Sequence, residues 1–266
     1  MYNRLAELEK YQCDPSYLEH FSLLVDFVKT SYASTTKRLT ALLEGHEITY
    51  DLLWALFKPN MVVYTTCFGT GKPRCVKYHF GEERKMDNGV EYFHLECHYV
   101  DFDGKAFGET SIELAILKFR GTKRIDSLDA FPLEYHPNKI QVKANLVELG
   151  RKFVSLMGVH HRQYRGDAFY MRKGQPIKVP VNSRIMIDAV FFQEANPNHT
   201  RPSINQSVKQ DSSDWPWIIF ESDDHFTNQS DQLKSNGKDP AEMDEDDSVL
   251  CSPNVPGFSY GNKLWG

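Results

Sequence analysis

The spacing of apolar residues divides the chain into a helical beginning and a longer run of strands. Over residues 17–32 apolar side chains recur at intervals of three and four, with the period of an amphipathic helix. Asp14 and Pro15 precede this stripe as an N-cap and a first helical residue, and Gly45 follows as a C-cap. The pattern therefore predicts a helical arm over residues 1–46.

From residue 61 the hydrophobic period changes to two, which is typical of β-strands. Strands or extended segments are expected at 61–67, 74–80, 92–101, 111–119, 125–133, 168–171, 177–181 and 184–192. One helix interrupts them at 141–156, and its predicted apolar face holds Val142, Leu146, Leu149 and Phe153. We predict an α+β fold for residues 47–195, dominated by a curled antiparallel sheet or a small barrel with one packed helix.

Composition excludes wholesale disorder and fibrous structure, because 41% of the 266 residues are hydrophobic and 25% are charged. The net charge of -5 is unevenly spread. Residues 196–247 hold 12 acidic and 4 basic residues, a net of -8, which leaves +3 for the rest. Such a segment buries little apolar surface, so we expect a flexible acidic linker at 196–247 and a connector at 248–266. Trp215 and Trp217 stand out in the linker. They are expected either to dock on a partner or to cover their own domain.

Cysteine use and the beginning of the chain indicate a reduced compartment. The five cysteines are odd in number and include no Cys-x-x-Cys pair. The first residues mix charges of both signs without an apolar core, unlike a secretory signal. No apolar run approaches the roughly 20 residues of a membrane span. We therefore expect an intracellular protein, cytoplasmic or nuclear, that is neither secreted nor membrane-spanning.

Two motifs resemble nucleotide sites but lack required residues. The segment 69–73 has the Gly-Lys of a phosphate-binding loop, but Pro73 stands where Ser or Thr would hold Mg²⁺. Asp188 ends an apolar segment like a Walker B motif, but Ala189 occupies the place of the catalytic Glu. We interpret 69–73 as a hairpin turn and Asp101–Gly104 as another, and we expect no cofactor and no detectable ATP binding in this chain.

The remaining candidates for chemistry are histidines and arginines. Strand alternation places His94 and His98 on one face and Cys97 on the other, which disfavours a shared metal ion. A basic group in a predicted loop after the helix is a candidate surface for an anion, a phosphorylated partner or an acidic protein, or else a solvated loop. Its members are His160, His161, Arg162 and Arg165. We do not expect nucleic acid as a partner, because the folded part carries only about +3.

Several segments resemble, as a set, the N-terminal region of a family of fungal AAA-type ATPases. The resemblance runs from about residue 31 to residue 266. It is carried by 49–59, 63–67, 72–75, 99–105, 118–125, 130–136, 150–156, 158–162, 183–188 and the connector-like 251–265.

The resemblance implies a domain of unknown function placed ahead of an ATPase core. In that family the core binds ATP and Mg²⁺, and none of its Walker or arginine-finger positions exists in these residues, so no catalytic or cofactor residue can be carried over. The chain would be a fragment or a truncated gene product. We expect a non-catalytic domain that recognises a protein substrate or partner for a covalently linked AAA core. The alternatives are an enzyme that uses His160 or His161 as a base or metal ligand, and an oligomerisation module built on residues 15–45.

Overall fold

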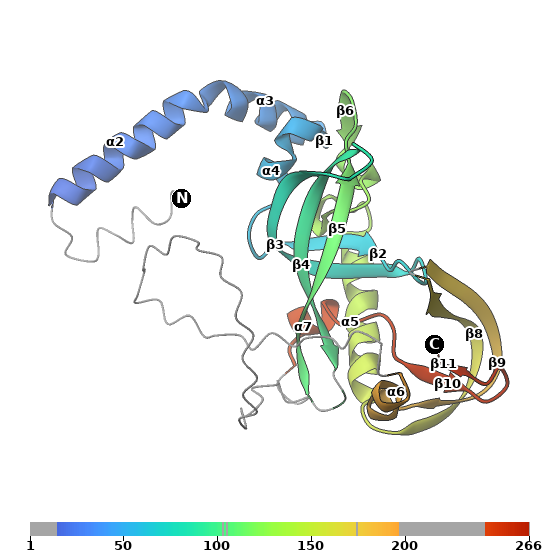
Figure 1. Ribbon diagram of the computed structural model, residues 1–266. Helices are drawn as coiled ribbons and strands as arrows, with labels where there is room; N and C mark the ends of the chain where they lie inside the picture. Colours follow the sequence, from blue (N-terminus) through green and yellow to red (C-terminus); the bar gives the residue numbers. More distant parts are fainter. Residues whose placement is uncertain (1–14, 103, 105, 174, 197–242, 266) are drawn as a thin grey trace, which may run out of the picture.

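The computed structural model describes residues 15–102, 104, 106–173, 175–196 and 243–265 (Figure 1). Three antiparallel sheets, of five, four and two strands, and a set of helices make up this part of the chain. The helices are α2 (Pro15–Ser31), α3 (Ala33–Glu44), α4 (Leu53–Leu56), α5 (Lys139–Ser155), α6 (Ala189–Ala195) and α7 (Glu245–Val249). Short 3-10 turns lie at η1 (Tyr50–Leu52), η2 (Ile125–Ser127) and η3 (Leu133–Tyr135).

The larger sheet confirms the predicted α+β class. It contains β5 (Phe107–Leu117), β4 (Glu91–Phe102), β3 (Pro73–Lys85), β2 (Val62–Thr66) and β7 (Phe131–Pro132), in that order. The predicted hairpins at 69–73 and at 101–104 join β2 to β3 and β4 to β5. Gly71 and Gly104 have φ of 70° and 95° there, which favours glycine. The sheet is curled but it does not close into the small barrel that we considered, because β5 and β7 remain its edges.

Strand alternation in β4 gives the two faces of this sheet different cores. Phe93, Leu95 and Cys97 point to the face covered by α4, η1 and β1 (Glu47–Thr49). Val100 points to the opposite face and packs with α5, α7 and Phe107. As predicted, His94 lies on the face opposite Leu95 and Cys97. Strand β1 pairs with β6 (Thr122–Arg124) in a separate two-stranded sheet. The larger sheet is therefore the central layer of the molecule.

The helical arm is formed by α2 and α3, and α2 extends away from the sheets (Figure 1). Gly45 is the C-cap of α3, and His46 after it takes the left-handed conformation, with φ of 55°. On α2, Leu23, Leu24 and Phe27 are more than half exposed. This exposure suits the oligomerisation alternative, which stays a prediction. No helix in the described part of the chain has the length and apolar character needed to cross a bilayer.

The second sheet corrects our assignment of the region after α5. We predicted a loop at 160–166 followed by three short strands, but the chain forms one long hairpin of β8 (His160–Arg172) and β9 (Gln175–Ile187). The predicted turn at 182–183 lies inside β9, and residues 189–192 of the strand predicted at 184–192 belong to α6. The sheet order is β11 (Leu264–Trp265), β10 (Gly257–Ser259), β9 and β8. Residues 160–166 are mostly polar, so hydrophobic alternation does not mark the first half of β8, while the predicted strand at 168–171 lies within β8.

The five-stranded and four-stranded sheets touch where the β2–β3 turn meets the β8–β9 hairpin. A Cβ on Gly69 would lie only 2.4 Å from the ring of Phe169, so this position requires glycine or a displaced ring. Lys178 donates a hydrogen bond to the carbonyl oxygen of Thr70 at 3.4 Å. These contacts hold the four-stranded sheet against the end of the five-stranded one.

The buried thiol of Cys75 makes the free energy of unfolding depend on pH in the alkaline range. Burial raises the pKa of the Cys75 thiol from 9.0 to about 12. Because an exposed thiol in the unfolded chain ionises first, the contribution of Cys75 to stability is complete below pH 9.0 and is lost as the pH rises above it. We predict that Cys75→Val gains about 1 kcal/mol relative to the wild type between about pH 9 and 10, and nothing between about pH 7 and 8. Urea unfolding of both proteins across this range measures the difference, and a pH-independent difference would refute the burial argument.

A groove along helix α5

Helix α5 supports the candidate site, and its sequence explains which face is buried. Leu146, Val147, Gly150 and Phe153 are buried at intervals of one, three and three, along one side of the helix. Our prediction that Leu149 belongs to the apolar face was wrong, because this side chain is 45% exposed. Gly150 takes part in the buried face in its place. Hydrophobic periodicity did not detect Gly150, because glycine has no apolar side chain.

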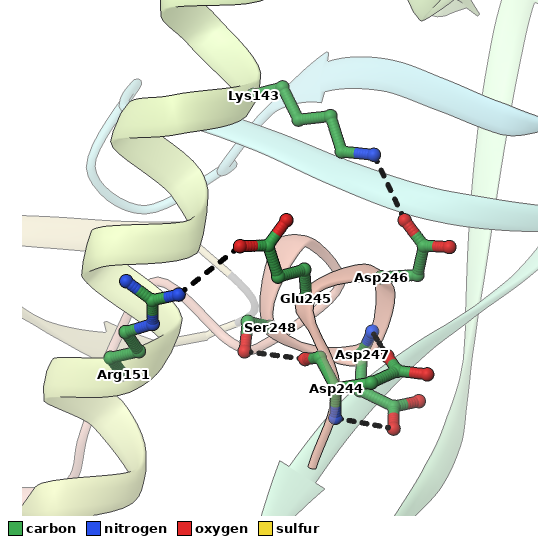
Figure 2. A network of polar contacts seen from close by, with 7 residues as sticks. All are labelled: Lys143, Arg151, Asp244, Glu245, Asp246, Asp247 and Ser248. Carbon is green, nitrogen blue, oxygen red and sulfur yellow. Dashed lines mark hydrogen bonds and ion pairs between the residues drawn. The ribbon is translucent and has the colours of Figure 1, made fainter.

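A second helix, α7, packs on α5 where we predicted the end of a flexible acidic linker. The acidic residues 244–247 contain a capping box: the Asp244 carboxylate accepts a bond from the Asp247 amide at 2.7 Å, and the Asp247 carboxylate accepts one from the Asp244 amide at 3.4 Å (Figure 2). The Ser248 hydroxyl donates to the carbonyl oxygen of Asp244 at 2.8 Å. The acidic residues thus satisfy the first amides of the helix and suit its dipole.

Glycine at position 150 allows α7 to approach α5 at backbone distance. A Cβ built on Gly150 would lie 2.1 Å from the carbonyl oxygen of Ser248, closer than atoms can pack. Beyond this contact, Val249, Leu250 and Cys251 are buried in the core that α5 shares with β4. The docking of α7 therefore rests on close packing and burial.

The chain after α7 is also bound to the larger sheet. The Val100 amide donates to the carbonyl oxygen of Leu250 at 2.9 Å, and the Ser252 amide donates to the carbonyl oxygen of Val100 at 2.8 Å. Cys251 and Val100 form a parallel bridge through these bonds. Residues 248–252, which we predicted as the start of a connector, thus pack between α5 and β4.

Two ion pairs join the same helices at their exposed sides. Lys143 donates to Asp246 at 2.9 Å and Arg151 donates to Glu245 at 3.3 Å (Figure 2). The hydrogen bond that Lys143 donates to the carboxylate of Asp246 raises the pKa of Lys143. All four side chains are about half exposed or more, so each pair contributes little to stability. The pairs instead hold two carboxylates along one face of α5.

Between α5 and the start of β2 lies a groove of about 870 Å³, and α7 borders it through Glu245. Its apolar wall comes from three elements: the segment before β2, η3 and α5. The apolar lining residues are Pro59, Met61, Val62, Leu133, Ile140, Ala144 and Val147, and the charged ones are Lys58, Lys139, Lys143, Arg151, Glu134 and Glu245. Ile140 is 82% exposed at its edge. An open groove that combines an apolar wall with spaced charges is suited to binding side chains of a partner.

The structure separates the site residues that we predicted. Along β8 the side chains alternate, so His160 and Arg162 lie on one face of the hairpin while His161 and Arg165 lie on the other. His160 Nε2 lies 2.6 Å from the carbonyl oxygen of Met157. The four residues do not form one surface, because the predicted loop is a strand, and their role in binding a partner stays a prediction. Trp215 and Trp217 lie outside the described residues.

Sequence reasoning missed the groove residues. Lys139 and Lys143 are four residues apart, and Arg151 follows eight residues later, so helical period alone places them near one face of α5. That signal was present in the sequence. Lys58 and Glu134 join them only through the fold, because β2 and η3 bring distant segments to α5.

The described residues give little support for a metal site or a reactive thiol. Within these residues no three His, Cys, Asp or Glu side chains gather as a metal site would require. The thiol of Cys67 is unusual: burial raises its pKa, but hydrogen bonds from Thr70, Asn254 and the Gly69 amide outweigh burial and lower the pKa below 9.0. Asn254 Nδ2 lies 3.0 Å from the sulfur. Only 5% of Cys67 is exposed, so the bonds fix the turn against the C-terminal segment.

Comparison with known proteins gives one match. A family model described as a domain of unknown function (DUF7025) matches residues 38–137. No curated protein and no solved structure matches the chain. The matched range spans the larger sheet and the part of the groove at 58–62 and 133–134, whereas α5 and α7 lie beyond it. The match supports a domain of unknown function, and the resemblance to AAA-type ATPases stays a prediction.

The close contact between α5 and α7 makes Gly150 sensitive to any side chain. Gly150→Ala would raise the intrinsic helix propensity of α5 by about 1 kcal/mol, but its methyl group would collide with the backbone of Ser248. Because backbone cannot move aside like a side chain, we predict a net destabilisation of about 1–3 kcal/mol in urea unfolding. Asn145→Ala, on the exposed side of the same helix, is the control and should change stability by less than about 0.5 kcal/mol. A stabilised Gly150→Ala protein would show that α7 does not dock there.

Packing and ion pairs at the same interface can be compared directly. Leu250→Ala removes a buried side chain and should cost about 2–5 kcal/mol. The double variant Lys143→Ala and Arg151→Ala removes both exposed ion pairs and should cost about 2 kcal/mol at most. Chemical denaturation of the three proteins measures both effects. A larger loss of stability in the double variant than in Leu250→Ala would mean that charge, not burial, holds α7 in place.

Proposed function

We propose that this chain is a non-catalytic recognition domain that holds a partner protein in the groove along α5. The observation that carries the proposal is the combination of an open apolar wall with four basic side chains in one groove. The apolar wall supplies burial for a partner's side chains. The spaced charges supply orientation and selectivity, since charge complementarity contributes mostly to specificity and association rate.

The groove is suited to a protein rather than to a small substrate undergoing reaction. Its openness leaves Ile140 and Ala144 accessible along the helix, whereas catalytic sites generally enclose their substrates and exclude water. The cations that line it are flexible lysines and one arginine. Recognition of an extended or helical segment in such a groove is a common mode of peptide binding.

The resemblance to AAA-type ATPases adds a role for the bound partner. We propose that the domain presents its partner to an ATPase core, which would bind ATP and Mg²⁺ and generate the remodelling force. The residues of this chain would bind and orient, while hydrolysis would take place in the core. The resemblance of 251–265 to the family's connector supports this arrangement.

Peptides selected on the protein can locate the binding site. We predict that peptides selected from a random display library on the wild-type chain will cross-link to a benzophenone amino acid placed at Ile140. They should not cross-link when the same amino acid is placed at Leu149, which is exposed on α5 but does not line the groove.

A blocking variant gives the matching binding measurement. Ala144→Trp puts a large ring into the groove and should weaken the selected peptides by about tenfold or more, equal to about 1.4 kcal/mol. Asn145→Trp places the same ring one residue along the helix, outside the groove, and should leave the affinity unchanged. Cross-linking at Leu149 alone, or equal binding by both tryptophan variants, would refute a binding site in this groove.

A further inference from the structure

The charges along α5 are only partly used by α7. The groove is lined by four cations and two carboxylates, and α7 engages the cations at the far end, Lys143 and Arg151. Lys139 lies one turn before Lys143, and Lys58 lines the groove from the segment before β2. Neither Lys58 nor Lys139 forms an ion pair with any residue in the described ranges. The open end of the groove thus retains two cations for a ligand.

The contacts of α7 with Lys143 and Arg151 indicate what kind of ligand Lys58 and Lys139 can accept. Its carboxylates at Glu245 and Asp246 reach α5 from a short acidic segment (Figure 2). The buried residues that follow anchor it by apolar contacts. Acidic residues next to apolar anchors are therefore compatible with the surface of α5. The internal contact ends at Lys143, and the same helix face continues to Lys139.

The apolar wall near the open end can receive a similar anchor. Ile140 is 82% exposed beside Lys139, and Met61 and Leu133 line the same groove. A large exposed aliphatic side chain next to unpaired cations indicates a contact that needs both burial and charge. A partner with carboxylates alone would leave this wall exposed, and a purely apolar partner would leave the lysines without a counter-charge.

We propose that the partner's binding segment is an acidic peptide with interspersed leucine-like side chains, which lies along α5 beyond α7. Its carboxylates contact Lys58 and Lys139, and its apolar side chains pack on Ile140, Met61 and Leu133. This proposal rests on the proposed function and names the class of partner. A nucleic acid fits less well, because Glu134 and Glu245 lie in the same groove and would repel a continuous line of phosphates.

Fluorescence anisotropy with a designed peptide tests this proposal. The probe is a labelled synthetic peptide in which aspartate and glutamate alternate with leucine. Two comparison peptides replace either every acidic residue by lysine or every leucine by serine. We expect the first peptide to bind, the lysine peptide not to bind, and the serine peptide to bind at least about tenfold more weakly.

Charge-reversal variants with equal net charge locate the contact. The pair Lys58→Glu and Lys139→Glu should weaken the acidic peptide by about tenfold or more. The control pair, Lys37→Glu and Lys152→Glu, changes the net charge equally at exposed positions outside the groove and should change affinity by less than about twofold. Equal effects of both pairs would show that only overall charge matters and would overturn the proposal.

The outcomes separate this proposal from the function on which it rests. If Ala144→Trp blocks library-selected peptides but the Lys58 and Lys139 reversals do not, the groove binds a partner and the acidic class is wrong. If neither Ala144→Trp nor the reversal of Lys58 and Lys139 weakens binding, both proposals fail. A labelled oligonucleotide that binds more tightly than the acidic peptide, and loses binding on reversal of Lys58 and Lys139, would assign the groove to nucleic acid instead.

Discussion

The approach of α7 to Gly150 is the constraint on which the rest of the site depends. Only a residue without a Cβ allows the backbone of Ser248 to lie against α5, and this contact places Val249, Leu250 and Cys251 in the core beside β4. Once α7 is held there, its carboxylates face Lys143 and Arg151, and Glu245 becomes part of the groove. A single small residue therefore links a structural contact to the shape and charge of the candidate binding surface.

The two kinds of contact at this interface have different roles. Burial and backbone hydrogen bonds to Val100 supply the free energy that keeps residues 248–252 in place. The ion pairs are exposed, so they add little free energy and mainly fix which cations are already matched. We expect the same division of roles for the proposed partner. Its apolar contacts would give affinity, and its contacts with the lysines would give selectivity.

The sequence predicted elements wherever local pattern and tertiary structure agree. The alternation of His94, Leu95 and Cys97 in β4 and the turns at 69–73 and 101–104 follow from local chemistry, and the structure confirms them. It also confirms the helical period of α5, apart from Leu149. The first half of strand β8 was predicted as a loop at 160–166, because its side chains are mostly polar and no hydrophobic alternation marks it, whereas the predicted strand at 168–171 lies within β8. Helix α7 was missed because its acidic composition is also that of a disordered segment, and its helix depends on contacts with a helix about 100 residues earlier.

The candidate site was harder to predict than the fold. The basic residues of α5 were visible at helical spacing, but their importance depends on Lys58, Glu134 and Glu245, which only the tertiary structure brings near them. The predicted group at 160–165 had a higher local density of charge, yet strand alternation divides it between two faces. Charge density along a sequence is thus a poor guide to charge density in space when the secondary structure is assigned wrongly.

Hydrogen exchange of the Ser252 amide tests the central claim most directly. This amide donates to the carbonyl oxygen of Val100 only while the segment after α7 lies between α5 and β4. The account predicts protection comparable to that of the amides in the β3–β4 ladder, since both should open only with the core. Exchange of Ser252 at the rate of an unstructured peptide, while the β3–β4 ladder remains protected, would show that α7 is not part of the folded domain and would contradict the account.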